Sequence, residues 1–175
     1  RNGSICFSLR NGLFRNTGAC LSPQNAFYNS IGMETLGLRM ERVCDNAKTL
    51  AQFFATEYSD IEVNYPGLAG SKWHNIATEQ FGDKFGGIIT IRTGNKKRAF
   101  GIIDALKLPL IVSNIGDTKT LVIHPESTLN VHSTQEEKET AGVFDDLIRI
   151  SVGIEDIEDL IDDFKQAIES VKDVY

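Results

Sequence analysis

The stretch Leu147-Ile148-Arg149-Ile150-Ser151-Val152-Gly153-Ile154-Glu155-Asp156 places one cation inside an apolar run rich in β-branched residues, which is typical of a strand. Successive strand side chains point to opposite faces, so Arg149 shares a face with Leu147 and Ser151. The opposite face carries Ile148, Ile150 and Val152. A guanidinium held beside a hydroxyl offers a planar fork that can bind a carboxylate through two hydrogen bonds. A solvated face is the more common place for a strand arginine, and this segment alone leaves both interpretations open.

The hydrophobic pattern around this strand predicts a mixed α/β chain. Ser22 followed by Pro23 predicts the start of a long helix that runs to about Thr56. Glycines inside a helix are unfavourable, so we expect another backbone to approach closely at Gly32 and Gly37. One seam of apolar residues is expected along this helix. The pattern predicts two further helices, at about 72–81 and 96–106, and strands at 61–65, 86–91, 108–113 and 120–124.

A closing helix is predicted from about Glu155, because apolar residues recur there at helical spacing. Its carboxylates lack the glycine and oxygen-ligand spacing of a calcium-binding loop. Acids early in a helix complement its dipole, so we expect a solvated outer face made of Glu158, Asp159, Asp162 and Asp163.

Composition limits the class of protein. The 175 residues, of which 41% are hydrophobic, suffice for one ordinary domain with its own core. A formal net charge of -6 and the absence of a basic block argue against a nucleic-acid or anionic-membrane partner. The longest apolar runs are too short to span a bilayer, so a cytoplasmic location is expected. Three cysteines without a C-x-x-C pair favour free thiols in a reducing compartment.

Several familiar catalytic and ligand-binding patterns are missing from the sequence. It contains no phosphate-binding loop, no dinucleotide-binding fingerprint and no G-x-S-x-G nucleophile turn. Residues 94–97 could bind an anion at a helix start but are more simply a turn between a strand and a helix. His124, Glu126 and His132 lack the close spacing of zinc ligands, so no metal site is predicted.

A set of short blocks along the chain, taken with its order and spacing, carries a specific resemblance. The blocks are Gly18–Pro23, Gly32–Leu36, Asn64–Leu68, Phe85–Gly87, Ser113–Asp117, Leu121–Thr128 and the arginine strand. Together they resemble the C-terminal part of the cysteine and methionine metabolism enzymes that use pyridoxal phosphate. Within that family the chain looks most like the O-acetylhomoserine sulfhydrylases, because Asn114-Ile115-Gly116-Asp117 stands where the cystathionine enzymes usually have a Ser-Leu-Gly-Gly type of turn.

The resemblance implies an α/β (α+β) fold, the small C-terminal domain of the type I aminotransferase-like transferases. Such a domain has a mostly antiparallel sheet, packed helices and a long N-terminal helix. Residues 1–21 would then be a connecting segment from a missing N-terminal large domain, and residues 22–175 the substrate-side domain. The absence of an initiating Met also indicates a fragment. The family further implies a homo-oligomer for the full-length enzyme.

The resemblance also implies site residues. Arg149 would bind the α-carboxylate of an amino-acid substrate, and Asn114 would contact the same carboxylate. Pyridoxal 5'-phosphate and its Schiff-base lysine belong to the large domain in this family, so we expect no catalytic, cofactor-binding or metal-binding residue in this chain. Lys119 follows a threonine, but it is expected to be an ordinary solvated lysine. The chain alone would therefore be inactive.

The implied reaction is a γ-replacement that makes homocysteine or methionine. Two departures from the family pattern, Glu126 for a common alanine and Leu129-Asn130 for a Thr-His pair, leave the substrate pocket open. No histidine role is carried over for that reason. The alternatives are a fragment of a cystathionine or methionine γ-lyase or γ-synthase, and a free-standing binding or oligomerisation domain. The sequence does not decide the sulfur donor or the oligomeric state of the fragment.

Overall fold

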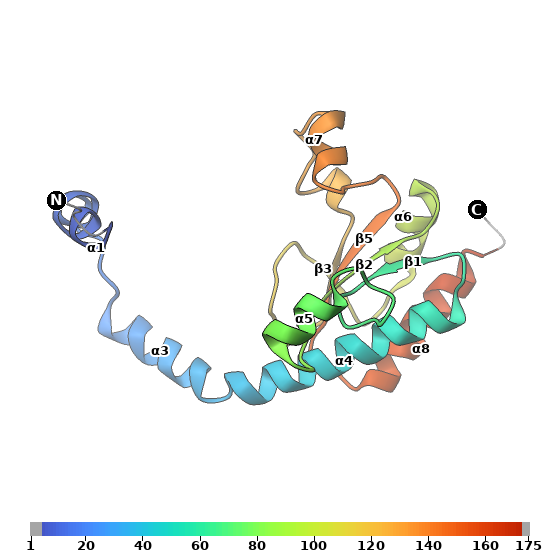
Figure 1. Ribbon diagram of the computed structural model, residues 1–175, viewed down its shortest axis with the longest axis horizontal. Coiled ribbons are helices and arrows are strands. Elements are labelled where there is room, and N and C mark those ends of the chain that lie inside the picture. Colours follow the sequence, from blue (N-terminus) through green and yellow to red (C-terminus); the bar gives the residue numbers. More distant parts are fainter. Residues whose placement is uncertain (1–4, 173–175) are drawn as a thin grey trace. The chain divides into compact units, whose positions relative to one another are not determined.

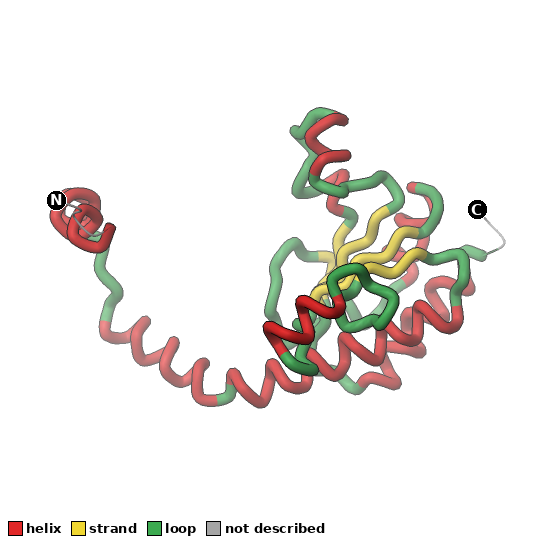
Figure 2. Tube along the Cα trace, viewed as in Figure 1, coloured by secondary structure: helices red, strands yellow, loops and turns green. Residues whose placement is uncertain are grey.

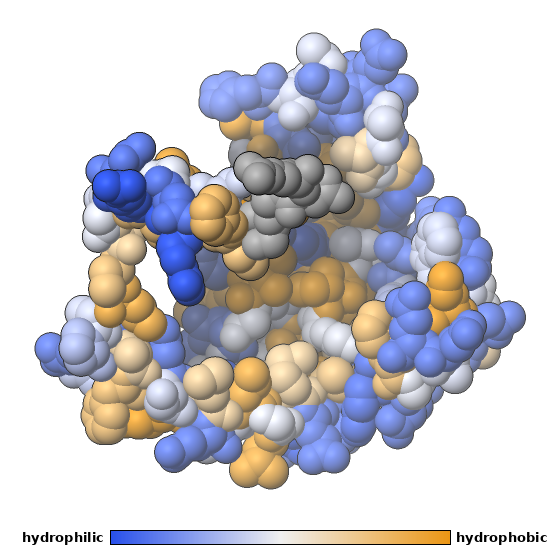
Figure 3. All heavy atoms as spheres, turned by 60° about the vertical axis from the view of Figure 1, so that its left-hand side comes forward, coloured by the Kyte–Doolittle hydropathy of each residue, from blue (hydrophilic) through white to orange (hydrophobic). Residues whose placement is uncertain are grey.

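The computed structural model describes residues 5–172 and divides the chain into two compact units, Arg1–Gly37 and Leu38–Tyr175 (Figure 1). The described part of the first unit is helical. It contains α1 (Ile5–Leu9), a π-helical turn (Arg10–Phe14), α2 (Arg15–Thr17) and α3 (Pro23–Glu34). None of the residues from 5 to 34 is buried, and the space-filling view in Figure 3 shows apolar side chains at the molecular surface. The connecting role expected for residues 1–21 stays a prediction.

The predicted long helix is two helices. The Ser22 hydroxyl accepts a hydrogen bond from the backbone N–H of Asn25 at 3.2 Å, which confirms the predicted start of α3. The helix ends at Glu34, Thr35 leaves helical geometry with φ −106° and ψ 5°, and α4 (Leu36–Glu57) follows. Glycines on both sides of Thr35 weaken helical structure there. The close backbone approach expected at these glycines is not made by the described residues of this chain, since an added Cβ at either would meet none of their atoms within 4 Å.

Five strands form one sheet, drawn in yellow in Figure 2. Their order is β1-β2-β5-β4-β3, and every pairing is antiparallel except the parallel pair β3 and β4. This confirms the mostly antiparallel sheet. The strands are β1 (Glu62–Asn64), β2 (Ile88–Arg92), β3 (Leu110–Ile111), β4 (Leu121–Ile123) and β5 (Leu147–Ser151). β3 is shorter than the strand expected over 108–113.

Helices cover one face of this sheet. The core joins residues of α4, α6 (Lys96–Ala105) and α8 (Ile157–Ser170) to the apolar face of β5, as strand alternation predicted. The Phe54 and Phe164 rings meet edge to face, with centroids 5.2 Å apart, and Ile148 and Ile150 are fully buried. The other helices of unit 2 are α5 (His74–Phe81) and α7 (Gln135–Thr140).

The C-terminal third differs from the sequence-based expectations at two points. No element was expected between the strand at 120–124 and β5, but this segment contains α7, which begins with a capping box made by Thr134 and Glu137. Asp163 was expected on a solvated face, but it is buried. Its carboxylate accepts the backbone N–H groups of Lys107 and Leu108, both at 2.9 Å, because these donors need a partner once α6 has ended.

Candidate functional site

Arg149 lies on the central strand of the sheet, on the face opposite the core. β5 places it beside Thr90 of β2 and Ile123 of β4. Asn64 of β1 lies opposite Thr90, and its side-chain amide donates to the Thr90 hydroxyl at 3.3 Å. A row of side chains therefore crosses four strands, with the cation near its middle. Neighbours bonded on both sides of β5 fix the position of Arg149 in the sheet.

The guanidinium of Arg149 is only partly satisfied. Its Nη2 donates to the main-chain carbonyl of Ser113 at 2.8 Å and to that of Asn114 at 3.3 Å. Its Nε is buried and has no hydrogen-bond partner among the described residues. Burial lowers the pKa of Arg149, although a guanidinium stays charged at neutral pH. A buried donor without a partner costs about 1–3 kcal/mol, so an anion that accepts from Nε would be favoured.

The segment Ser113–Asp117, called the site turn below, runs along the Arg149 face of β5. The Ser151 hydroxyl accepts a hydrogen bond from the backbone N–H of Gly116 at 3.2 Å. Gly116 has φ +79°, a left-handed conformation that favours glycine. The structure thus brings together the two residues that the sequence proposed, Arg149 and Asn114. The contact is made by the Asn114 carbonyl, and a role for the Asn114 side chain stays a prediction.

The end of the site turn is closed by local hydrogen bonds. The Asp117 carboxylate accepts the backbone N–H of Lys119 at 3.1 Å and the hydroxyl of Thr118 at 3.3 Å, and these bonds lower the pKa of Asp117. The Thr118 carbonyl accepts the N–H of Ile154 at 2.9 Å, which joins the turn to the chain just after β5. The Lys119 side chain is exposed.

Glu155 makes a second connection beyond β5 that sequence reasoning missed. Its carboxylate accepts the backbone N–H of Thr120 at 2.5 Å and the Thr120 hydroxyl at 2.9 Å. The side-chain amide of Asn46, on α4, donates to the Gly153 carbonyl at 3.1 Å and to the Glu155 carbonyl at 2.9 Å. The strand that carries Arg149 is therefore tied to both the neighbouring strand and the helical layer.

An open groove of about 1050 Å³ lies along the same sheet face. The groove is lined by Asn64 and Thr90, which neighbour Arg149 across the sheet, and by Trp73 and Phe144. Arg92 also lines the groove, with its guanidinium 4.0 Å from the centre of the Phe144 ring and its Nε 3.0 Å from a carboxylate oxygen of Asp146. Arg92 differs from Arg149 because a carboxylate already accepts from its Nε.

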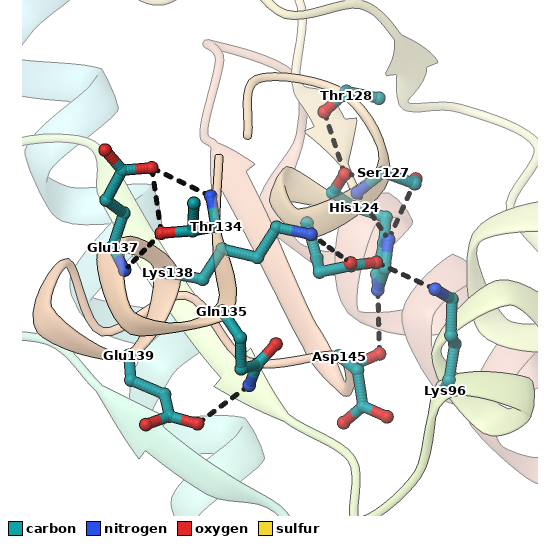
Figure 4. Close-up of polar contacts among 11 residues, drawn as sticks. Lys96, His124, Ser127, Thr128, Thr134, Gln135, Glu137, Lys138, Glu139 and Asp145 are labelled. Atoms are coloured by element: carbon teal, nitrogen blue, oxygen red, sulfur yellow. Dashed lines mark hydrogen bonds and ion pairs between the residues drawn. The ribbon is translucent and has the colours of Figure 1, made fainter. Parts of the chain in front are cut away.

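Two of the residues considered as metal ligands, His124 and Glu126, have other partners, and Figure 4 shows those of His124. The Nδ1 of His124 accepts the backbone N–H of Ser127 at 3.3 Å, so its Nε2–H donates to the Asp145 carbonyl at 2.8 Å. Glu126 accepts Lys96 at 2.7 Å and Lys138 at 2.5 Å. Within residues 5–172, no three histidine, cysteine or acidic side chains are grouped as metal ligands.

Other sequence features have structural explanations. The Asn95 side chain accepts the N–H of Arg98 at 2.9 Å and begins α6, so residues 94–97 are a turn that starts a helix. The three cysteines are free thiols, with Cys44 buried and Cys6 and Cys20 exposed. None of the described helices combines the length and apolar character that crossing a membrane requires. The cytoplasmic location stays a prediction.

Comparison with known proteins places this geometry in context. Residues 5–169 match the family model described as Cys/Met metabolism PLP-dependent enzyme. An L-methionine gamma-lyase of Fusobacterium nucleatum is 41% identical over 161 residues, which are 91% of this chain and 40% of that protein. The chain therefore spans about two fifths of the length of this relative.

Solved structures agree with the fold. A Campylobacter jejuni protein assigned as an O-acetylhomoserine (thiol)-lyase, which carries a pyridoxyl-lysine group, superposes with a TM-score of 0.87 at 39% identity, over 95% of this chain and 40% of that one. The O-acetylhomoserine sulfhydrylase of Wolinella succinogenes gives a TM-score of 0.79 at 36% identity, over 93% of this chain and 43% of that one.

Proposed function

The chain belongs to the Cys/Met metabolism PLP-dependent enzyme family, and from this premise we propose that it is the C-terminal, substrate-side domain of a longer O-acetylhomoserine sulfhydrylase. Two observations support a longer enzyme. The chain spans 40% and 43% of two structurally similar proteins. The helices of its first unit leave large apolar side chains exposed, among them Ile5, Phe7, Phe27 and Met33.

The observation that carries the proposal is the buried Nε of Arg149, which has no partner among the described residues. Arg149 shares its sheet face with the hydroxyl-bearing residues Thr90 and Ser151, and a guanidinium with an unused donor fits the carboxylate of an amino acid. None of these three side chains is the amine that a covalent link to the cofactor requires. Pyridoxal phosphate, when bound by the rest of the enzyme, supplies the electron sink for chemistry at Cα.

Arg149 has an orienting role in the proposed reaction. Its free Nε–H binds the α-carboxylate, while its Nη2 remains on the Ser113 and Asn114 carbonyls. Fixing the carboxylate limits rotation about Cα and holds the bond to be broken in one orientation. Acetate then leaves Cγ and the sulfur of sulfide or of a thiol forms a bond to the same carbon. Arg149 contacts the substrate throughout, and no proton transfer is assigned to it.

A γ-lyase is the second candidate, because a methionine gamma-lyase is 41% identical to the chain. Both reactions need the same carboxylate site, so product analysis separates them. We expect full-length enzyme to consume O-acetylhomoserine only when sulfide or a thiol is present, with homocysteine or methionine as product. Formation of a 2-oxo acid and ammonia from methionine alone would instead support the lyase.

A free-standing binding or oligomerisation domain is the alternative from another class. The native reading frame tests it. We expect an upstream segment of large-domain size that contains the cofactor lysine, and a reading frame without such a segment would contradict the proposed enzyme.

Substitution of Arg149 tests the site itself. In the full-length enzyme, Arg149→Lys keeps a positive charge but loses the planar fork, so we expect KM for the amino acid to rise about tenfold or more. Arg92→Lys is the matched control, since Arg92 lies on the same sheet face and Asp146 already accepts from its Nε. Unchanged KM and kcat in Arg149→Lys and Arg149→Ala would contradict the proposed role.

A further inference from the structure

We propose that Ser151 is a positioning residue that fixes the site turn and thereby orients the Arg149 guanidinium. This inference rests on the proposed function, because it concerns how the carboxylate site is assembled. Ser151 itself need not touch substrate. Its hydroxyl oxygen lies 3.2 Å from the backbone N of Gly116, and this contact is the starting observation.

The place of Ser151 in the sheet is rigid. It follows Arg149 by two residues on β5, so the two side chains share a face and stand roughly 7 Å apart along the strand. Ser151 lies opposite Ile88 of β2 and Leu121 of β4, and only 2% of its surface is exposed. A buried hydroxyl between two bonded neighbours makes a fixed attachment point.

The site turn has two attachments to this face. Arg149 Nη2 holds the start of the turn through the Ser113 and Asn114 carbonyls. The Ser151 hydroxyl holds the far end through the Gly116 N–H. One attachment alone would let the turn pivot, whereas two attachments on one strand define its position.

The two attachments also act on the guanidinium. The carbonyls of the turn determine where Nη2 points, and the orientation of the planar group then determines where the buried Nε–H points. If Ser151 loses its oxygen, the turn and its carbonyls can shift, and Arg149 loses its preset orientation. Binding of the carboxylate should weaken more than the later chemistry.

Removal and replacement of the hydroxyl test this role. In the full-length enzyme we expect Ser151→Ala to raise KM for the amino acid about five- to tenfold while kcat changes less than about threefold. Ser151→Thr keeps the hydroxyl oxygen, so its KM should lie close to that of the unsubstituted enzyme. Thr93→Val is the matched control, because it removes another buried hydroxyl, which bonds to Asn95 and Asp146 away from the site turn.

Amide hydrogen exchange provides a readout that does not depend on activity. In the 175-residue chain, Ser151→Ala should speed exchange at the Gly116 N–H about fivefold or more, because its acceptor is gone. The Ile154 N–H, which bonds to the Thr118 carbonyl, is the internal reference and should change less.

The outcomes separate the two proposals. If Arg149→Lys raises KM but Ser151→Ala changes neither KM nor exchange at Gly116, the positioning role is wrong and the proposed function stands. If Arg149→Lys and Arg149→Ala both leave KM and kcat unchanged, the carboxylate site is wrong, and the positioning role of Ser151 is wrong as well. A Ser151→Ala enzyme whose kcat falls while KM stays constant would also overturn the positioning role.

Discussion

Among single residues, Arg149 combines a positive charge with a buried and unused donor, its Nε, at the centre of a sheet. Strand alternation predicted the face on which it lies, because side chains alternate whatever the rest of the fold does. The same rule placed Ser151 beside it. The main-chain carbonyls that Arg149 contacts could not be predicted in this way, because every residue carries a carbonyl and only the folded turn selects two of them.

Asp163 gives a residue-scale prediction about stability. Its buried carboxylate accepts the N–H groups of Lys107 and Leu108, so Asp163→Ala should leave both without that acceptor and lower the free energy of unfolding by about 1–3 kcal/mol. Urea denaturation measures this value. Asp162→Ala is the control, because Asp162 is exposed on the same helix, and equal losses in the two variants would contradict this hydrogen-bonding role of Asp163.

The burial of Asp163 also shows why sequence reasoning failed there. The spacing of acidic residues along a helix is the same whether their side chains face water or the end of another helix. The apolar residues of α8 were predicted correctly, because their recurrence at helical spacing reports the packed face directly. The backbone partners of Asp163 are 55 and 56 residues away in the chain, and no local signal encodes that contact.

At the scale of elements, Glu126 links two helices. Its two carboxylate oxygens accept Lys96 of α6 and Lys138 of α7, and these bonds lower its pKa from the ordinary value of 4.5 to about 2. The charged form is therefore stabilised in the folded state. The contribution is complete above about pH 5 and is lost as the pH falls from 4.5 toward 2, since the unfolded chain takes up the proton first.

Glu126→Gln tests this link. We expect the free energy of unfolding at pH 7 to fall by about 1 kcal/mol, and the difference from the unmodified chain to shrink as the pH approaches 3. Denaturant unfolding across that pH range measures both. Glu136→Gln, an exposed acid in the first turn of α7, should have little effect at any pH. A difference that grows on acidification would contradict the assignment.

A second element-scale prediction concerns the close approach of two chain segments after β5. A Cβ at Gly153 would lie 2.5 Å from the Thr118 carbonyl oxygen and 2.6 Å from the Lys119 carbonyl carbon, both of which belong to the backbone. Gly153→Ala should therefore cost about 1–3 kcal/mol of stability and shift the end of the site turn. Thermal unfolding measures the cost.

Gly70→Ala is the matched control for that experiment, because no described atom lies within 4 Å of its added Cβ. We expect Gly70→Ala to change stability by less than about 0.5 kcal/mol. Tolerance of Gly153→Ala at the same level would show that the two segments are not held as closely as described.

For the whole molecule, the two units differ in how far the hydrophobic pattern of the sequence predicts which residues are buried. Unit 2 has a core built from helices and a sheet, and its elements were predicted from periodicity because each buries its own apolar face. In unit 1, periodic patterns do not lead to burial within residues 5–34. The break at Thr35 was missed for a related reason, since none of residues 5–42 is buried and no packed face marks where α3 ends and α4 begins.

The 175-residue chain should not bind the cofactor covalently. The Lys119 side chain is exposed, so any imine formed there would remain open to hydrolysis. We expect no visible absorbance band of a cofactor–lysine adduct after addition of pyridoxal phosphate and removal of the excess. A stable band that Lys119→Arg abolishes would contradict the view that this lysine is an ordinary surface residue.

A crystal structure of the full-length enzyme with its amino-acid substrate, or an unreactive analogue, bound would show directly where the carboxylate lies. We predict a carboxylate oxygen within about 2.7–3.2 Å of Arg149 Nε, with Nη2 still on the site-turn carbonyls. A substrate whose carboxylate binds elsewhere, while Arg149 Nε keeps no partner, would contradict the assignment of this strand arginine as the substrate anchor.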